Sequence, residues 1–379
     1  MTDSEVREAA APAAPITWIS YEEFGAEFFR RAVTIDRISN AVNGIAGRGI
    51  KIGPIQIGLL AGFRADGDIG QPKVRQHEGD QVAFDVEVPA ALVVTINALG
   101  QEVRIEVGVE IDLEMHARAA DPLLIVIDIP SITDDDVRLV IKAEALGAAW
   151  QRILAPMGES IRREVATRIN AMLRDPGSVN GRVFDIAQRI NDTPPVTRTS
   201  ADFTWIDYGE FGRRFFREAV TRERIQNAVA DMDGREISFG PLKTGPKEMV
   251  TVRADGAMRL PKVSDRPGGE YVSFDLLIPI GLDMVISAPR DNHYEARIDI
   301  PLVLNARAAA PLSIVIDVVP VQADDISIDL TAKGFGAHVL GAVGGVKKQL
   351  REQVAATVRD ETADPSGRIV DVAERVDNA

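Results

Sequence analysis

The stretch VRIEVGVEIDLEM, from Val103 to Met115, decides the fold of this chain. Every odd-numbered residue in it is apolar, and every even-numbered residue is charged or glycine. Because side chains alternate between the two faces of a strand, this pattern predicts a β-strand with one buried and one solvated face, as in an antiparallel sheet. At about 3.4 Å per residue the strand spans about 44 Å, well beyond the usual strand length.

An apolar stripe of comparable length follows it. Apolar residues recur there at steps of three and four, which predicts one long helix with a single apolar face: Trp150, Ile153, Leu154, Met157, Ile161, Val165, Ile169 and Leu173. Pro156 is expected to kink this helix or to restart it. A helix of about 25 residues spans about 38 Å, close to the length of the strand. We therefore expect Val165 and Ile169 to face the sheet.

The whole pattern occurs twice. Segments that match in the same order include Thr17-Trp18-Ile19 with Thr204-Trp205-Ile206, Gly53-Pro54 with Gly240-Pro241, Arg64-Ala65-Asp66-Gly67 with Arg253-Ala254-Asp255-Gly256, and Ala117-Arg118-Ala119-Ala120 with Ala306-Arg307-Ala308-Ala309. The second copy of the long strand runs from Tyr294 to Leu304, and the second helical stripe from Val339 to Val358. The chain is therefore a tandem duplication.

The domain organisation follows from the repeat. Residues 1–15 are Ala/Pro-rich after an acidic start, which is typical of a disordered tail. The first repeat covers 16–192, a proline-containing linker covers 193–202, and the second repeat covers 203–379. We expect two separate domains with a boundary between Ile190 and Phe203.

Each repeat begins with a predicted helix. Ser20-Tyr21-Glu22-Glu23 has the spacing of a capping box. Apolar residues then recur near helical spacing as far as Val42, which predicts one helix ended by Gly44 and Gly47. Further strands are expected at 123–129 and 137–143. The predicted fold class is α+β, with two homologous units in tandem. Each unit is a long helix packed in a strongly curved antiparallel sheet, because two one-sided elements of equal length bury their apolar faces best against each other.

Composition excludes several classes of function. The chain has 379 residues, a formal net charge of −14 and no cysteine. Disulfides, zinc–thiolate sites and thiol catalysis are therefore excluded. The negative charge argues against nucleic acid as a partner, because such proteins neutralise phosphates with clustered basic residues. These features together favour the cytoplasm. Nine of the 43 basic residues are lysine, which is typical of a GC-rich bacterial genome.

Four groups of residues are candidate sites. The histidines His77, His116, His293 and His338 have no metal-binding spacing, and the glycines near Gly47 match no phosphate loop. The acidic run Asp134-Asp135-Asp136, with Asp324-Asp325 in the second copy, suits either a calcium site or a turn in which aspartate accepts backbone hydrogen bonds. Arg118 and Arg307 suit either an anionic headgroup or an ion pair between strands.

The order of helix, long curved strands and long closing helix resembles the tubular lipid-binding (TULIP) superfamily. The resemblance covers each repeat from Thr17 to about Asp192 and from Thr204 onward, and it lies in the layout. It implies a tube whose interior holds lipid acyl chains and a transient contact with membranes. The residues expected to line the tubes are Ile105, Val107, Val109, Ile111, Leu113, Ile161, Val165, Ile169, Ile298, Ile300, Leu350 and Val354.

The sequence favours two functions over a third, an enzyme whose acid–base chemistry would lie in scattered Asp and Glu residues. The first is the binding or transport of a lipid or other apolar ligand inside the cell, without catalysis, cofactor or metal. The second is a structural or interaction module whose cores are filled by protein side chains. The oligomeric state does not follow from the sequence.

Overall fold

A computed structural model describes residues 15–57, 61–98, 100–142, 148–194, 202–244, 249–287, 290–333 and 340–377. The expected tail, apart from Pro15, and most of the expected linker lie outside these residues. The chain divides into two compact units. Gly25–Gly212 with Val376–Ala379 forms the first-repeat unit, and Met1–Phe24 with Arg213–Arg375 forms the second-repeat unit.

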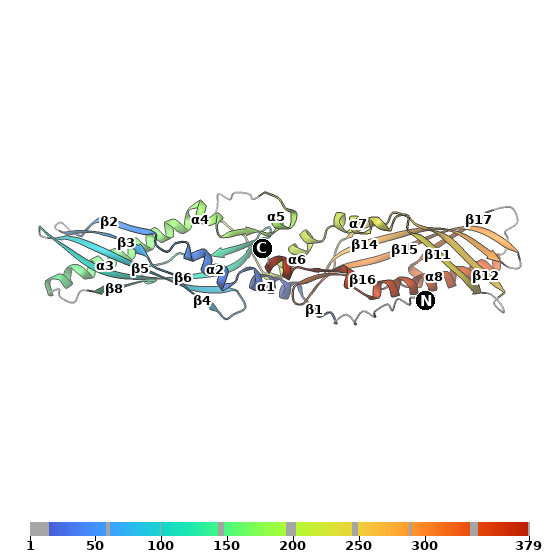
Figure 1. Cartoon of the computed structure of the whole chain (residues 1–379), viewed down its shortest axis with the longest axis horizontal. Coiled ribbons are helices and arrows are strands. Elements are labelled where there is room, and N and C mark those ends of the chain that lie inside the picture. The colour runs from blue at the N-terminus through green and yellow to red at the C-terminus, as the bar shows by residue number, and fades with distance from the viewer. Residues whose placement is uncertain are drawn as a thin grey trace, which may run out of the picture. The chain divides into compact units, whose positions relative to one another are not determined.

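The sheet of the first-repeat unit is built around one long antiparallel hairpin (Figure 1). Its strands β5 (Ala83–Ala98) and β6 (Gln101–Ala120) pair from Ala83 opposite His116 to Ala98 opposite Gln101. Shorter strands flank the hairpin at its two ends: β2 (Gly49–Ile57), β3 (Ala61–Ile69), β4 (Lys73–His77), β7 (Leu124–Asp128), β8 (Val137–Lys142) and β9 (Val183–Asp185). The strand predicted at 103–115 is confirmed as the middle of a strand of 20 residues.

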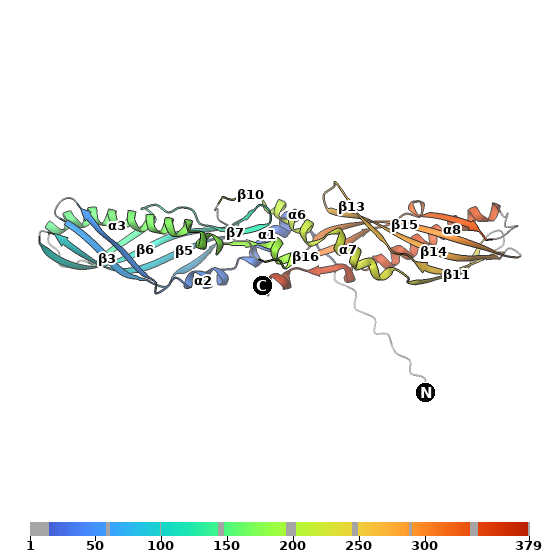
Figure 2. The same cartoon turned by 90° about the horizontal axis from the view of Figure 1, so that it is seen from above.

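The second-repeat unit repeats this topology. Its central hairpin joins β14 (Val272–Ser287) to β15 (Asp291–Ala309), which pair along the whole of β14. The flanking strands are β11 (Glu236–Thr244), β12 (Val250–Met258), β13 (Lys262–Arg266), β16 (Ser313–Val319), β17 (Ser327–Ala332) and β18 (Ile369–Asp371). Both sheets are antiparallel and strongly curved, so the α+β fold class with two similar half-barrel units is confirmed (Figures 1 and 2).

The repeated Gly-Pro pairs explain a local bend in each outer strand. The pairing of β2 with β3 shifts between Ile52 and Ile55, and that of β11 with β12 shifts between Phe239 and Leu242. Gly53 lies in the first of these shifts with φ 86°, and Gly240 lies in the second with φ 97°. Positive φ values of this kind disfavour any residue that carries a side chain. Such bulges bend the strand and make it a poorer template for pairing with another sheet.

One long helix runs lengthwise along each sheet (Figure 2). α3 (Ala148–Arg174) lies beside β2 and β8, and α8 (Leu340–Ala363) lies beside β17 and the short 3-10 helix η3 (Ala323–Asp325). Arg168 Nη1 donates to the Lys51 carbonyl of β2 at 2.5 Å, and Gln349 Nε2 donates to the Lys243 carbonyl of β11 at 3.5 Å. Each helix therefore lies between the two edges of a curved sheet. α3 continues through Pro156 without a restart.

Short elements follow the long helices. They are α4 (Pro176–Asn180) and α5 (Ile186–Asn191) in the first-repeat unit, and η4 (Ser366–Arg368) and α9 (Ala373–Asp377) after the second long helix. Asp175 caps α4, accepting a hydrogen bond from the Gly177 amide at 3.0 Å, with Pro176 at its first position. The Asp-Pro pair thus ends one helix and starts the next.

The opening helix of each repeat is two helices, so the prediction of one continuous helix was wrong. α1 (Tyr21–Ala32) and α2 (Ile35–Asn43) are separated at Thr34, and α6 (Tyr208–Ala219) and α7 (Arg222–Val229) at Thr221; η1 (Ala230–Met232) follows α7. Thr34 Oγ1 accepts a hydrogen bond from the Arg37 amide at 3.3 Å, which caps α2. A capping threonine outweighs the apolar periodicity here. The capping box at Ser20 and Glu23 is confirmed.

The compact units differ from the sequence repeats at their opening segments. β1 (Trp18–Ile19), from the first repeat, pairs with β15 and completes the sheet of the second-repeat unit. β10 (Trp205–Ile206), from the second repeat, pairs with β6 and completes the sheet of the first-repeat unit. The long strands and long helix of each repeat stay together in one unit.

Candidate functional site

The concave face of the first-repeat sheet carries the predicted β6 residues. Ile105, Val107, Val109 and Ile111 are all buried, and Val107 is 1% exposed. Val107 lies directly opposite Leu92 of β5 and Ile141 of β8, so apolar side chains continue across the sheet. Leu113, which was predicted to join them, is only partly buried.

The second-repeat sheet has an equivalent face. Ile298 and Ile300 are buried and lie opposite Ile280 and Ile278 of β14. Tyr294, on the same face nearer the end of the hairpin, is also buried and lies opposite Met284. This end therefore carries an aromatic and a thioether side chain on the buried face of the hairpin.

The long helices present buried apolar residues of their own. Ile161 and Val165 of α3 and Leu350 of α8 are buried, Ile161 fully so. Ile169 and Val354, one turn further along each predicted stripe, are only partly buried. Val165, which was expected to face the sheet, is buried, whereas Ile169, expected to face it too, keeps part of its surface exposed.

Buried residues in both units are almost all apolar. Among the described residues, the buried polar side chains are Thr95 and Ser313, and no charged side chain is buried. The central side chains of both units are between 0% and 6% exposed, so protein atoms cover them. Of the predicted lining residues, all but Leu113, Ile169 and Val354 are therefore buried within their units.

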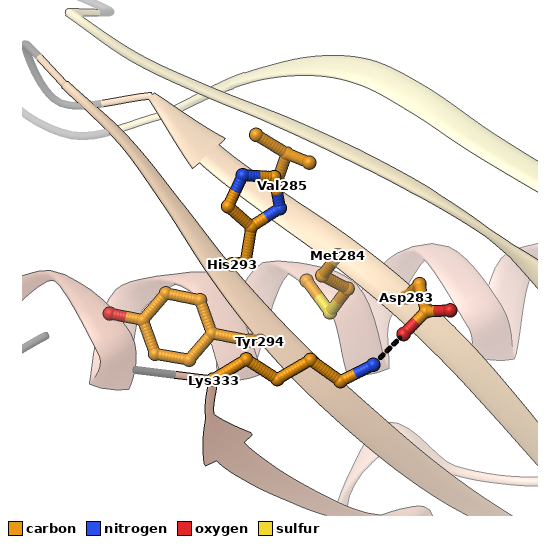
Figure 3. A pocket seen from close by; sticks show the side chains of 6 residues that line it. All are labelled: Asp283, Met284, Val285, His293, Tyr294 and Lys333. Carbon is orange, nitrogen blue, oxygen red and sulfur yellow. Dashed lines mark hydrogen bonds and ion pairs between the residues drawn. The ribbon is translucent and has the colours of Figure 1, made fainter. Parts of the chain in front are cut away.

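A surface pocket of about 480 Å³ lies at the end of the second-repeat hairpin (Figure 3). It is lined by Asp283, Met284, Val285, His293, Tyr294 and Lys333. Val285 and His293 are directly opposite each other, and the Lys333 amide donates to the His293 carbonyl at 2.8 Å. The Lys333 ammonium forms an ion pair with Asp283, and this hydrogen bond raises the pKa of Lys333. Because each charge already has a partner at an exposed position, the pocket offers little beyond a weak polar contact.

Arg118 and Arg307 each form an ion pair and a contact with a tryptophan ring. Arg118 Nη1 pairs with Asp128 at 3.0 Å, and its guanidinium lies 3.8 Å from the centre of the Trp205 ring. Arg307 pairs with Asp317 at 3.3 Å and lies 3.8 Å from the centre of the Trp18 ring. The ion-pair interpretation of these arginines is therefore the one that the geometry supports, and the stacked tryptophan adds to it.

The acidic runs form turns. Asp136 Oδ2 accepts hydrogen bonds from the amide and the hydroxyl of Thr133, at 2.7 and 2.9 Å. Asp325 Oδ2 accepts one from the Gln322 amide at 3.1 Å. Of the histidines, His77 pairs with Asp85 and His116 with Glu114, His293 lines the surface pocket, and His338 lies outside the described residues.

Sequence reasoning missed the role of two tyrosines. The hydroxyl of Tyr21 donates to the Ala306 carbonyl at 2.7 Å and accepts from the Val272 amide at 3.1 Å, which joins β15 to β14. Tyr208 makes the equivalent contacts with Ala117 and Val82. Burial raises the pKa of Tyr21 to about 12. The signal for both was present, since each tyrosine recurs at the same place in its repeat, two residues after Trp-Ile.

Comparisons with known proteins gave matches at the level of structure. No family model matches the sequence, and no curated protein matches it. Among solved structures, lipopolysaccharide binding protein aligns over 92% of this chain and 90% of its own, with 9% identity and a TM-score of 0.29. P47 from Clostridium botulinum A2 aligns over 84% of each chain, with 7% identity and a TM-score of 0.27. P47 of Clostridium botulinum E1 aligns over 88% and 87%, with 8% identity and a TM-score of 0.27.

Proposed function

We propose that this chain binds a lipid or another apolar ligand, without catalysis, between the long helix and the concave face of each sheet, as in a TULIP-like tube. One observation carries the proposal. Each helix lies beside the edges of its curved sheet, and the faces it closes off are lined by apolar residues such as Val107 and Ile298. An interior without buried charges suits a ligand that has no polar group to satisfy.

Access to such an interior requires the helix to move away from a sheet edge. The α3–β2 border includes the hydrogen bond from Arg168 to the Lys51 carbonyl, and the α8–β11 border includes the one from Gln349 to the Lys243 carbonyl. Both are exposed contacts between a flexible side chain and a strand edge, which cost little to break. A ligand that enters there would replace contacts between helix and sheet by contacts with itself.

The same movement of the helix would allow the chain to transport its ligand. A helix that opens near a membrane surface would let the ligand pass without exposure to water, and transient membrane contact is part of the proposal. No helix among the described residues is long and apolar enough to cross a membrane. We propose the cytoplasm as the compartment, because the chain has no cysteine.

A second candidate function is a structural module with filled cores. It is favoured by the near-zero exposure of Val107, Ile161 and Leu350, which protein atoms cover. In that case the side chains of helix and sheet fill the interior at the density of an ordinary protein core.

Extraction of the purified protein separates the two functions. Native mass spectrometry of the intact chain, followed by organic extraction, is expected to reveal co-purifying lipid or another apolar molecule. If the protein carries nothing and also takes up no fluorescent fatty acid from vesicles of neutral phospholipid, the ligand-binding function is wrong and the filled module remains.

A bulky substitution inside the first-repeat unit gives a second test. Val107→Trp should displace ligand from that unit while the melting temperature changes little, because the added ring takes the place of the ligand. In a filled core the same change should cost about 1–3 kcal/mol. Val93→Trp is the matched control, since Val93 lies on the neighbouring strand and is 46% exposed. A large loss of stability in Val107→Trp, with no ligand in either protein, would favour the filled module.

A further inference from the structure

Each unit contains a strand-addition site that is filled by an opening segment. We define the opening segments as residues 17–24 and 204–211. Trp18 and Ile19 pair with Ala309 and Ala308 of β15, and the Ala310 amide donates to the Thr17 carbonyl at 2.9 Å. Residues 205 and 206 pair with 120 and 119 of β6 in the same register, and the amide of residue 121 donates to the carbonyl of residue 204 at 2.9 Å.

The tyrosine of each segment is inserted between the two strands of the long hairpin. The Tyr21 hydroxyl bridges the Val272 amide and the Ala306 carbonyl. Val272 and Ala306 are the last pair of the β14–β15 ladder, so the hydroxyl supplies contacts at the point where the strands begin to separate. The Tyr208 hydroxyl does the same for Val82 and Ala117. A phenol with one donor and one acceptor position satisfies both backbone groups at once.

The tryptophan and a phenylalanine fix the two ends of the segment. The Trp18 ring stacks on the guanidinium of Arg307, which is also paired with Asp317. The centre of the Tyr271 ring lies 5.3 Å from the same guanidinium. Phe24 is fully buried against Phe216, with ring centres 5.0 Å apart. Aromatic side chains in pockets together with backbone pairing are the usual means by which a sheet edge recognises a peptide.

The two sites are built from the same residues. Both acceptors contain the sequence Ala-Arg-Ala-Ala, and both segments contain Thr-Trp-Ile-x-Tyr-x-x-Phe. In each unit the segment comes from the repeat that does not build the sheet. The acceptor therefore recognises the segment's side chains and backbone, without regard to continuity of the chain beside it.

We propose that the acceptor on the β14–β15 hairpin binds the opening segment of a second copy of this chain when its own segment is withdrawn. The chain then associates with itself by strand exchange. Within one chain, the opening segment of one repeat already pairs with the sheet of the other. The same contacts can form between two copies, so the exchange requires no new interface. Only the identity of the donor chain changes.

A pair of full-length variants tests this association. Trp18→Ala with Tyr21→Phe removes the donor, and Arg307→Glu in another chain removes the acceptor, since a carboxylate beside Asp317 repels and no cation covers the indole. Each variant alone should sediment like the parent. An equimolar mixture should form a complex of one copy of each, because the free segment of the second variant fits the vacant acceptor of the first. Two folded variants that form no mixed complex would overturn the proposal.

Peptides keep the proposal testable if a variant folds poorly. A labelled peptide of residues 16–24 should bind the donor-less variant at least about tenfold more tightly than it binds the parent, where the tethered segment competes. It should also raise the variant's melting temperature, as any ligand of the native state does. A peptide of residues 203–211 should bind the same acceptor. Peptides with both aromatic residues replaced by alanine are the control, and equal binding of these would contradict the proposal.

Discussion

Arg118 and Arg307 each contact an aromatic ring and a carboxylate at the same time. Arg307 is covered by the Trp18 ring on one side and paired with Asp317 at its edge. Its side chain is 25% exposed, so these contacts are partly shielded from water. Cation–π stacking and a carboxylate pair use different parts of a guanidinium, and lysine cannot reproduce both.

Tyr21 should make stability depend on pH in the alkaline range. Burial raises its pKa from 10.0 to about 12, so the unfolded chain loses this proton at a lower pH than the folded one. The contribution is complete below pH 10 and is lost as the pH rises through 12, with an upper limit of about 2–3 kcal/mol. Urea unfolding of the parent and of Tyr21→Phe, followed between pH 9 and 12, measures it. Parallel curves for the two proteins would show that this tyrosine has no part in the effect.

Gly67 should tolerate no side chain. It belongs to the repeated Arg-Ala-Asp-Gly, and a Cβ built on it would overlap with the Ala91 carbonyl of the neighbouring strand. Gly67→Ala is expected to cost more than about 2 kcal/mol, because backbone atoms of two paired strands must separate. Gly345→Ala is the control. A Cβ at Gly345 meets nothing within 4 Å, and alanine favours the helix by about 0.5–1 kcal/mol. Chemical denaturation of both variants decides the comparison.

At the scale of elements, the long helices matter through their position at the sheet edges. α3 lies beside β2 and β8, and a Cβ added at Gly158 would be in van der Waals contact with a methyl group of Leu139 of β8, at 3.8 Å. The apolar face of this helix closes the interior, whereas its other face is exposed. A charge on the inner face should therefore act differently from a charge on the outer one.

Ile161→Asp should unfold or aggregate the first-repeat unit. Ile161 is fully buried, and an unpaired carboxylate there costs several kcal/mol before it protonates or the helix moves. Ile169→Asp, at the partly buried end of the stripe, should cost less. Arg163→Asp is the exposed control. Circular dichroism melting curves should rank the three in this order. Equal stability of all three would show that this helix face does not pack in the core.

Local sequence predicted an element correctly where one signal acted alone, and wrongly where a capping residue competed with apolar periodicity. Strict alternation from Val103 to Met115 predicted β6, because a period of two has one structural solution. The apolar periodicity from Phe24 to Val42 predicted one helix, yet Thr34 and Thr221 begin new ones. A single capping hydroxyl is easily overlooked in an apolar stripe, although it decides where a helix begins.

At the scale of the whole molecule, each repeat supplies its sheet and long helix to one unit and its opening segment to the other. This division explains why Trp-Ile and Ala-Arg-Ala-Ala are both repeated. The segment and its acceptor must match, although they belong to different copies of the repeat.

Substitutions in an opening segment should therefore act on the sheet of the other repeat. Trp18→Ala should raise hydrogen exchange in β14 and β15, and Trp205→Ala should raise it in β5 and β6. Each variant serves as the control for the other. Mass spectrometry of peptides from the two hairpins measures both. Faster exchange confined to the mutated repeat's own hairpin would contradict the pairing.

The sequence by itself determined the duplication, the long one-sided strands and the long helices, because these follow from local periodicity and from matches that recur in the same order. Only the tertiary structure decided which acceptor each opening segment occupies. Both acceptors carry the same residues, so no local pattern distinguishes them, and the choice depends on the path of the chain. The burial of the inward side chains could also be read only from the tertiary structure. It depends on the distance between helix and sheet, which results from many small twists along the strands.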